Sequence, residues 1–294
     1  MRRLWIPAIL AVALVAGTVA DRPRDREPIV AGDYIVLSGD FHLHSGLTSG
    51  GSMTPWGLVG EALRQDLDVI AITGHNEAWG GRVARAFSRV AASPIVLVGE
   101  EVTSATQDLI AVGIQSTIAP HLPLIDQIAE IHRQGGVAIA AHPIQRFHRA
   151  YIDTGAAKAI DGTEVCHVVM YERQGSGDEL IEFANATDAT PIGSSDFHAS
   201  GRVGTCRTFV FAREATERGV LQAIRDRRTV VYAMNGRAFG DPELVRMADA
   251  LGLRDVAARY TRARGSALDW ISRLGAIAGL IGIALTTRPP STRP

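Results

Sequence analysis

A pair of histidines follows an apolar stretch near the start of the chain, in the segment GDFHLHSG at residues 39–46. Imidazole nitrogens bind transition metals, and the carboxylate of Asp40 lies two residues before the first histidine. In an extended strand the side chains alternate between two faces, which predicts that Asp40, His42 and His44 share one face. The segment is therefore a candidate source of metal ligands.

Polar residues of the same kinds follow several other short apolar runs along the chain. Each run has the length of a strand and ends in a histidine or a carboxylate. The residues at these ends are His42, His44, His75, Glu100, Glu101, His142, Asp196 and His198. A single histidine beside an apolar run is commonly a core residue. Histidines and carboxylates at successive strand ends instead predict a metal cluster.

The fold must bring these strand ends together. Between about residues 34 and 236 the apolar runs are separated mostly by segments with helix signals, such as Thr54 and Pro55 at the start of PWGLVGEALRQ. Strands that alternate with helices predict a parallel sheet, and seven or eight such units predict a barrel. The carboxyl ends of barrel strands meet at one mouth, where active sites of this architecture are built.

The composition excludes several classes of protein. The chain has 294 residues, 46% of them hydrophobic, and a net charge of −1, so it can bury a full core and has no bulk attraction to nucleic acid. It contains no serine nucleophile elbow, GxGxxG fingerprint or Walker loop. The only cysteines are Cys166 and Cys206, which excludes a disulfide framework. We expect two small core thiols, with a single bridge as the alternative.

Both ends of the chain carry apolar segments. Residues 4–20 follow MRR without a charge and predict either an uncleaved membrane anchor, which we favour, or a signal peptide. Residues 270–287 predict either a transmembrane helix or an amphipathic or buried helix. The expected divisions are 1–27 for the anchor or signal peptide with a linker, 28–240 for the catalytic domain, 241–265 for a linker helix, and 266–294 for the last helix and tail. We therefore expect an extracytoplasmic, membrane-attached domain, or a secreted one if the first segment is cleaved.

The motifs DFHLH, ITGHN, GEEVTS, AAHP and SSDFH occur in an order and spacing that resembles the PHP (polymerase and histidinol phosphatase) superfamily of metal-dependent hydrolases. The resemblance covers roughly residues 34 to 236 and is closest to the stand-alone, membrane-attached type. It implies an α/β fold, a distorted (β/α)7 barrel, with two or three divalent transition metal ions (Mn, Zn or Fe) at its mouth. It does not fix the substrate.

The resemblance also assigns ligands. They are His42, His44 and Asp196 for the first metal, Glu101 bridging the first and second, His142 for the second, and His75 and His198 for the third. The chain departs from the family pattern at Gly50 and Gly74, which weakens the third site. It also has Asp108 where relatives place a histidine of the second metal. Aspartate still coordinates such ions, although Asp108 could instead cap a strand, in which case Glu164 or His167 would supply the ligand.

Two cations that share Glu101 would acidify a bridging water, so that hydroxide attacks the substrate. The expected catalytic residues are Glu101, Asp196 and His198. This chemistry predicts a metal-dependent hydrolase. The alternatives to a phosphoesterase are hydrolysis of an amide, carbamate or carboxylic ester at the same metals, and a non-catalytic metal-binding sensory or scaffold domain.

Three arginines follow the last two motifs. Arg146 comes after AAHPIQ, and Arg202 and Arg207 come after SSDFHAS. Guanidinium groups bind phosphate oxygens in a two-pronged geometry, so these residues are the predicted substrate-binding groups. The sequence therefore predicts a small phosphorylated substrate and no nucleic acid partner.

Overall fold

The computed structural model describes residues 5–20, 26–46, 50–91, 94–168, 170, 177–199, 202–258 and 267–286. The chain divides into two compact units, one formed by residues 25–260 and the other by residues 1–24 together with 261–294. The larger unit contains every predicted metal ligand.

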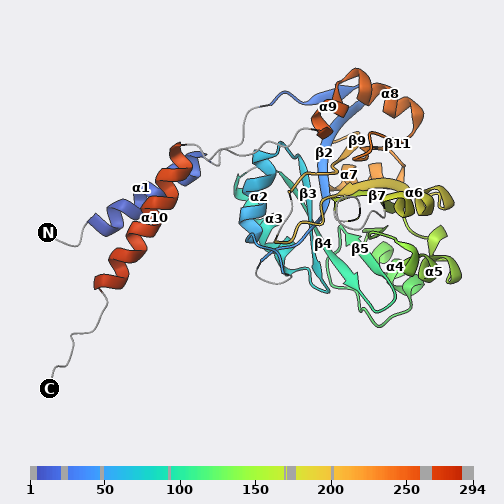
Figure 1. Ribbon diagram of the computed structural model, residues 1–294, viewed down its shortest axis with the longest axis horizontal. Helices are drawn as coiled ribbons and strands as arrows, with labels where there is room; N and C mark the ends of the chain where they lie inside the picture. Colours follow the sequence, from blue (N-terminus) through green and yellow to red (C-terminus); the bar gives the residue numbers. More distant parts are fainter. Residues whose placement is uncertain are drawn as a thin grey trace. The chain divides into compact units, whose positions relative to one another are not determined.

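The larger unit is built on one mixed sheet that curls into a nearly closed barrel (Figure 1). Its ten main strands are hydrogen-bonded in the order β11-β10-β9-β2-β3-β4-β5-β6-β7-β8, and β1 pairs with β2. The strands are β1 (Ile29–Ala31), β2 (Tyr34–Leu43), β3 (Val69–His75), β4 (Ile95–Thr103), β5 (Asp108–Val112), β6 (Val137–Ala140), β7 (Gly162–His167), β8 (Thr190–Ser194), β9 (Thr208–Ala212), β10 (Thr229–Tyr232) and β11 (Ala238–Gly240). The predicted α/β barrel is confirmed.

The sheet differs from the predicted parallel arrangement around β5 and β9. Strand β5 runs antiparallel to β4 and β6, and β9 runs antiparallel to β2 and β10. Strand β4 ends at Thr103 and β5 begins at Asp108, so a short loop joins them. Such a loop forces a hairpin, because parallel neighbours need a crossover of about a dozen residues or more.

Helices cover the sheet. They are α2 (Pro55–Arg64), α3 (Trp79–Ala91), α4 (Leu124–Arg133), α5 (Gln145–Asp153), α6 (Gly177–Ala186), α7 (Glu217–Arg225), α8 (Pro242–Ala250) and α9 (Leu253–Ala258), with a 3₁₀ turn at Ala156–Lys158. Thr54 and Thr216 begin α2 and α7 by accepting hydrogen bonds from the amides of Gly57 and Gly219. Each such cap satisfies an otherwise unpaired N–H group and contributes about 1 kcal/mol.

The interior of the barrel is closed at one end by α7. One buried cluster joins Phe41, Val69 and Leu97 of the strands to Val220 and Ile224 of the helix. The Thr190 hydroxyl, at the first residue of β8, donates to the carbonyl of Ile224 at 2.7 Å. Since Asp196 follows the last residue of β8, the predicted ligands lie at the opposite, open end of the barrel.

Two irregularities interrupt the strands that carry ligands. The pairing of β2 with β3 shifts register between Asp40 and Leu43, and the pairing of β7 with β8 shifts between Glu164 and Cys166. A bulge re-aims the side chains that follow it and is common beside active sites. Side chains of β2 and β7 near the open end of the barrel therefore do not alternate regularly between the two faces of the sheet.

Cys166 and Cys206 form a disulfide, which corrects the expectation of two free core thiols. The bond joins β7 to the segment just before β9. The two residues lie 40 positions apart in the chain, and the closure of the barrel brings them together.

The smaller unit is a pair of antiparallel helices, α1 (Trp5–Ala20) and α10 (Ala267–Thr286). Small residues let them pack closely, in the pairs Gly17 with Ser272, Ala13 with Gly275, and Leu10 with Gly279. Many apolar side chains remain exposed, including Val12, Leu14, Val15, Leu274, Ile277 and Leu280. None of the described helices combines the length and the apolar character that crossing a bilayer requires, so the predicted transmembrane anchors lack support.

Candidate metal centre

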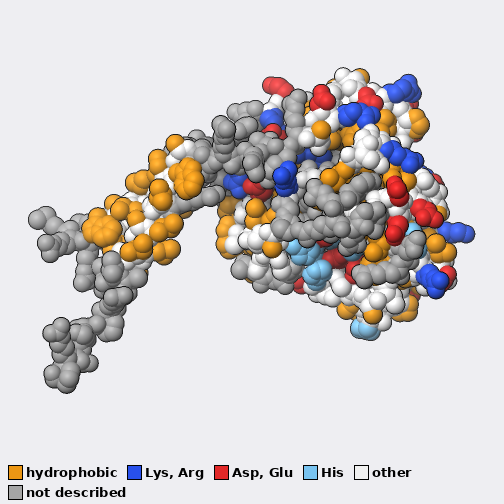
Figure 2. Space-filling view, viewed as in Figure 1, with side chains coloured by type: hydrophobic (Ala, Val, Ile, Leu, Met, Phe, Trp, Pro, Cys, Tyr) orange, Lys and Arg blue, Asp and Glu red, His pale blue; other side chains and the backbone are white. Residues whose placement is uncertain are grey.

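The predicted ligands converge at the open end of the barrel. They come from the ends of β2, β3, β4, β6 and β8 and from the start of β5. Figure 2 shows histidine and acidic side chains lying together on one face of this unit. The donor atoms there form four overlapping groups, and the atoms of each group lie within 4.8 Å of one another.

Four donor atoms face one another at the centre of the site. Each of the Nε2 atoms of His42 and His44 lies 3.2–3.4 Å from Glu101 Oε2 and from Asp196 Oδ1. Ligands about 2.05 Å from a tetrahedral Zn²⁺ ion lie about 3.3 Å apart. These four distances between imidazole and carboxylate therefore fit the ligands of a single divalent ion.

The same four atoms are buried and lack a hydrogen-bond partner within the described part of the chain. A buried polar atom without a partner costs about 1–3 kcal/mol. A cation satisfies all four together, so the donor set fits a metal, and His42, His44, Glu101 and Asp196 would hold it.

The ionisable groups of the site compete for protons. Burial opposes the charged form of His42, but Asp196, Glu101 and other carboxylates outweigh it and raise the pKa of His42 well above its usual value. Burial lowers the pKa of His44 to about 4, so this imidazole is neutral at neutral pH and offers a lone pair. A bound cation would take the place of the proton on His42, so metal binding should release protons.

The two carboxylate oxygens of Glu101 also lie close to histidines outside the central set of four donors. Its Oε1 lies 3.0 Å from His142 Nε2, and its Oε2 lies 2.8 Å from His75 Nδ1. Asp108 belongs to the same donor group as Glu101 and His142, and its buried Oδ1 has no partner among the described residues. The Tyr151 hydroxyl donates to the backbone carbonyl of Asp108 at 2.5 Å and fixes its position. This geometry suits the predicted second site.

A third donor group consists of His44, His75 and His198. The rings of His44 and His198 stack with their centroids 3.9 Å apart. Gly50 lies next to this group in a left-handed conformation, and a Cβ there would be 3.8 Å from His198 Cδ2. The missing side chain at Gly50 therefore leaves the third group without a donor from that position.

Glu164 and His167 of β7 also belong to the site, although the sequence predicted them only as substitutes for Asp108. Glu164 Oε1 lies 3.1 Å from His42 Nδ1, and its Oε2 accepts a hydrogen bond from the backbone N–H of His142 at 2.6 Å. A carboxylate at Nδ1 fixes the imidazole so that Nε2 faces a metal. His167 Nε2 lies 3.2 Å from Asp196 Oδ2. His167 forms a donor group with His42 and His142.

Two residues of the donor cluster have unusual backbone conformations. His142 has a φ of 26° and Asp196 a φ of 48°, in the left-handed region that residues with a Cβ rarely adopt. Such conformations cost about 1–3 kcal/mol, persist only where the surroundings fix them, and cluster at functional sites. The strain therefore coincides with the donor cluster.

Asp40 does not join this cluster, contrary to the prediction that it shares a face with His42 and His44. Its Oδ1 accepts from the backbone N–H of Ser195 at 3.1 Å, and its Oδ2 accepts from the N–H of Gly204 at 2.8 Å. The register shift in β2 separates it from the two histidines. Asp40 instead holds the segment that carries Asp196.

The predicted phosphate-binding arginines differ in their surroundings. Arg207 is buried, and its guanidinium donates to Ser38 Oγ at 3.2 Å and to the carbonyl of Gly204 at 3.1 Å. These contacts make Arg207 a structural residue and do not support its predicted substrate contact. Arg202 is exposed. The side chain of Arg146 lies outside the described residues.

Comparison with known proteins places these features in context. A family model described as PHP-associated matches residues 178–229. An uncharacterized protein from Methanocaldococcus jannaschii is 26% identical over 149 residues, which cover 47% of this chain and 85% of that protein.

A solved structure shares the fold. A two-domain protein from Bacteroides vulgatus that contains a predicted PHP-like metal-dependent phosphoesterase superposes with a TM-score of 0.60 and 23% identity, over 77% of this chain and 74% of that one. An amidohydrolase from Chromobacterium violaceum gives a TM-score of 0.46 and 18% identity, over 64% of this chain and 96% of that one, a likeness too low to support an argument. The family match and the shared fold together support the resemblance of this chain to the PHP superfamily.

Proposed function

We propose that this protein is a metal-dependent phosphoesterase that acts on small phosphorylated molecules. The observation that carries the proposal is the set of four buried donor atoms on His42, His44, Glu101 and Asp196, which lack a hydrogen bond within the described residues and lie at distances that suit the ligands of one divalent ion. The Bacteroides vulgatus protein with the same fold contains a predicted metal-dependent phosphoesterase, which supports the choice of phosphoesters. Two or three ions of Mn, Zn or Fe would fill the donor groups.

Divalent ions at these donors would acidify water and polarise the bond under attack. The protein's own residues prepare the site. Glu101 links two donor groups through its two oxygens, and Glu164 holds His42 with Nε2 toward the centre. His198 is more exposed than the central donors. Its Nδ1 lies 3.3 Å from the Asp196 carboxylate, which raises the pKa of His198. His198 can therefore hold a proton near a leaving group.

The test is a substrate screen on the metal-loaded protein. We expect at least one tightly bound transition metal per chain, and turnover of chromogenic phosphate monoesters or diesters that disappears after chelation and returns with Mn²⁺ or Zn²⁺. Turnover of carboxylic esters or amides alone would replace the proposed substrate class with the alternative one. Full metal occupancy without turnover of any substrate would favour a sensory or scaffold role.

We further propose that the larger unit works outside the cytoplasm and that the helix pair attaches it to lipid. Disulfides persist in oxidising compartments, and Cys166–Cys206 supports this location. The exposed apolar side chains of α1 and α10 support contact with lipid rather than with water. Small residues fill the contact between the two helices, so their apolar surface faces outward.

Location can be tested independently of activity. An export-dependent reporter fused after residue 30 should be active, and the full chain should sediment with membranes and resist extraction by high salt. Deletion of residues 266–294 should weaken this attachment. Recovery of the full chain in the soluble cytosolic fraction would contradict the proposal.

A further inference from the structure

The barrel has one gap in its hydrogen bonding, between β8 and the pair β9 and β10, which we name the seam. In the described part of the sheet no backbone ladder joins β8 to these strands. Threonine side chains bridge the seam instead: Thr208 Oγ1 accepts from Gly193 N at 2.8 Å, and Thr229 Oγ1 donates to the carbonyl of Pro191 at 2.8 Å. Near the open end, the backbone N–H of His44 also donates to the carbonyl of Phe197, after β8, at 3.0 Å. The seam is therefore closed by isolated hydrogen bonds rather than by a strand ladder.

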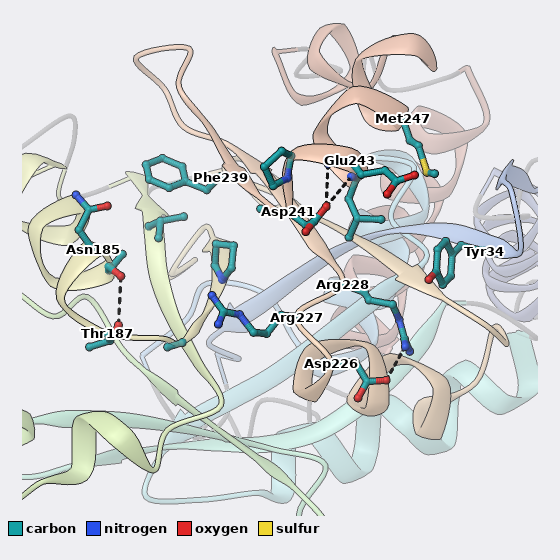
Figure 3. Close-up of a pocket in the computed structure, with 17 residues that line it drawn as sticks. Tyr34, Asn185, Thr187, Asp226, Arg227, Arg228, Phe239, Asp241, Glu243 and Met247 are labelled. Atoms are coloured by element: carbon teal, nitrogen blue, oxygen red, sulfur yellow. Dashed lines mark hydrogen bonds and ion pairs between the residues drawn. The ribbon is translucent and has the colours of Figure 1, made fainter.

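A cavity of about 780 Å³ opens beside the seam (Figure 3). Thr187 and Val165 line it from the side of β7 and β8, and Arg227 and Phe239 line it from the side of β10 and β11. The cavity lies beside the seam, whereas Gly193, Thr208 and Thr229 at the seam itself are buried.

The Cys166–Cys206 disulfide crosses the seam. Both cysteines are buried, in a cluster with Val165 and Val231. Cys166 directly precedes His167, whose Nε2 lies 3.2 Å from Asp196 Oδ2. The disulfide is thus a covalent link across the seam, and it lies next to the metal centre.

The other end of the bond anchors the segment that carries Asp196 and His198. This segment leaves β8 after Ser194 and returns to β9 at Thr208. Cys206 lies near its end with a φ of 56°, a left-handed conformation that costs about 1–3 kcal/mol unless the surroundings hold it. The backbone N–H of Gly204 donates to Asp40 at 2.8 Å. The disulfide and Asp40 therefore hold the returning end of the segment in place.

We propose that the Cys166–Cys206 disulfide is a positioning element of the metal centre. By tying β7 to the segment that returns from Asp196, it keeps His167 Nε2 beside Asp196 Oδ2. His167 thereby orients the carboxylate whose Oδ1 faces His42 and His44, and loss of the disulfide weakens the binding of the ion at that position. Strand β7 also pairs with β8 as far as His167 and Ser194, so the effect is partial. The inference rests on the metal site proposed above.

The test compares Zn²⁺ binding to the full chain in three forms. They are the wild type, the double variant Cys166→Ala/Cys206→Ala, and Thr229→Val, which removes another link across the seam at the start of β10. Loss of a residue that positions metal ligands typically lowers affinity ten- to a hundredfold. We expect a loss of this size for one ion in the cysteine variant, measured by equilibrium dialysis, and a changed visible spectrum of the Co²⁺-loaded protein. Thr229→Val should lower the melting temperature and keep wild-type affinity.

A second form of the experiment avoids the variants. Apo wild-type protein is treated with a dithiol, which supplies two electrons and two protons, leaves two thiols on the protein and becomes a disulfide itself. The dithiol is then removed without air before Zn²⁺ is added. The reduced protein should keep its native far-ultraviolet circular dichroism and bind Zn²⁺ as weakly as the double variant.

The outcomes separate this inference from the proposed function. If the wild type binds no Zn²⁺, the metal site itself is wrong. If the wild type binds Zn²⁺ and both disulfide-free forms bind it equally well, the disulfide does not position the centre. If metal is lost only together with global unfolding, the bond stabilises the whole barrel and the inference is also overturned.

Discussion

Glu101→Gln should remove bound metal and abolish hydrolysis. Glu101 is the residue whose two carboxylate oxygens lie next to His142 on one side and His75 on the other, while also facing His42 and His44. The amide keeps the shape of the side chain but loses its charge and one acceptor oxygen. Loss of residues that merely position ligands costs tenfold to a hundredfold. We therefore expect kcat/KM to fall by more than about a hundredfold, with metal per chain measured by elemental analysis falling in parallel.

The matched control is the neighbouring variant Glu100→Gln. The Glu100 carboxylate accepts a hydrogen bond from the backbone N–H of Ile118 and takes no part in the donor groups of the described residues. Burial raises the pKa of Glu100 to about 7, so a neutral amide resembles a form that is already populated at neutral pH. Metal content and kcat/KM should stay close to wild type. Equal losses of metal and of kcat/KM in both variants would show that β4 tolerates neither change. This result would contradict a specific role of Glu101.

Much of the donor cluster could be predicted because it follows from how parallel strands end. His42, His75, Glu101 and Asp196 lie at or just after the carboxyl ends of parallel strands, and the barrel brings those ends to one mouth. The sequence alone therefore predicted which residues the barrel brings together at the centre of the site. It placed Asp40 with them only because strict alternation was assumed across the register shift in β2.

Bulges and long-range closure account for what sequence reasoning missed. Glu164 and His167 are three residues apart, so alternation puts them on opposite faces of β7, yet both contact the site because the register shifts between Glu164 and Cys166. No local pattern marks such a shift. The disulfide likewise depends on where the segment before β9 returns beside Cys166 of β7, which is a property of the whole barrel. The antiparallel β5 did have a local signal, since a short loop separates it from β4.

The second large effect is expected at Asp108, where two arrangements of the second ion compete. In one, Asp108 binds it with Glu101 and His142; in the other, His167 binds it with His42 and His142. The Asp108 Oδ1 is buried without a hydrogen-bond partner in the described structure, and burial together with the charge of Glu101 raises the pKa of this carboxyl. A buried carboxylate in such surroundings is costly unless a cation compensates it. This favours Asp108 as the ligand.

We therefore expect Asp108→Ala to lose one ion per chain and most turnover, while the ion held by His42, His44 and Asp196 stays bound. Asp108→His should restore the ion but shift the activating metal from Mn²⁺ or Fe²⁺ toward Zn²⁺, because an imidazole replaces a harder oxygen donor. Elemental analysis after dialysis and activation by each metal measure the two effects.

The comparison with His167→Ala decides between the arrangements. If Asp108→Ala keeps both ions and wild-type kinetics while His167→Ala loses one ion, Asp108 only caps β5. The Asp108 Oδ1 would then be a buried acceptor that the fold tolerates without a bound metal.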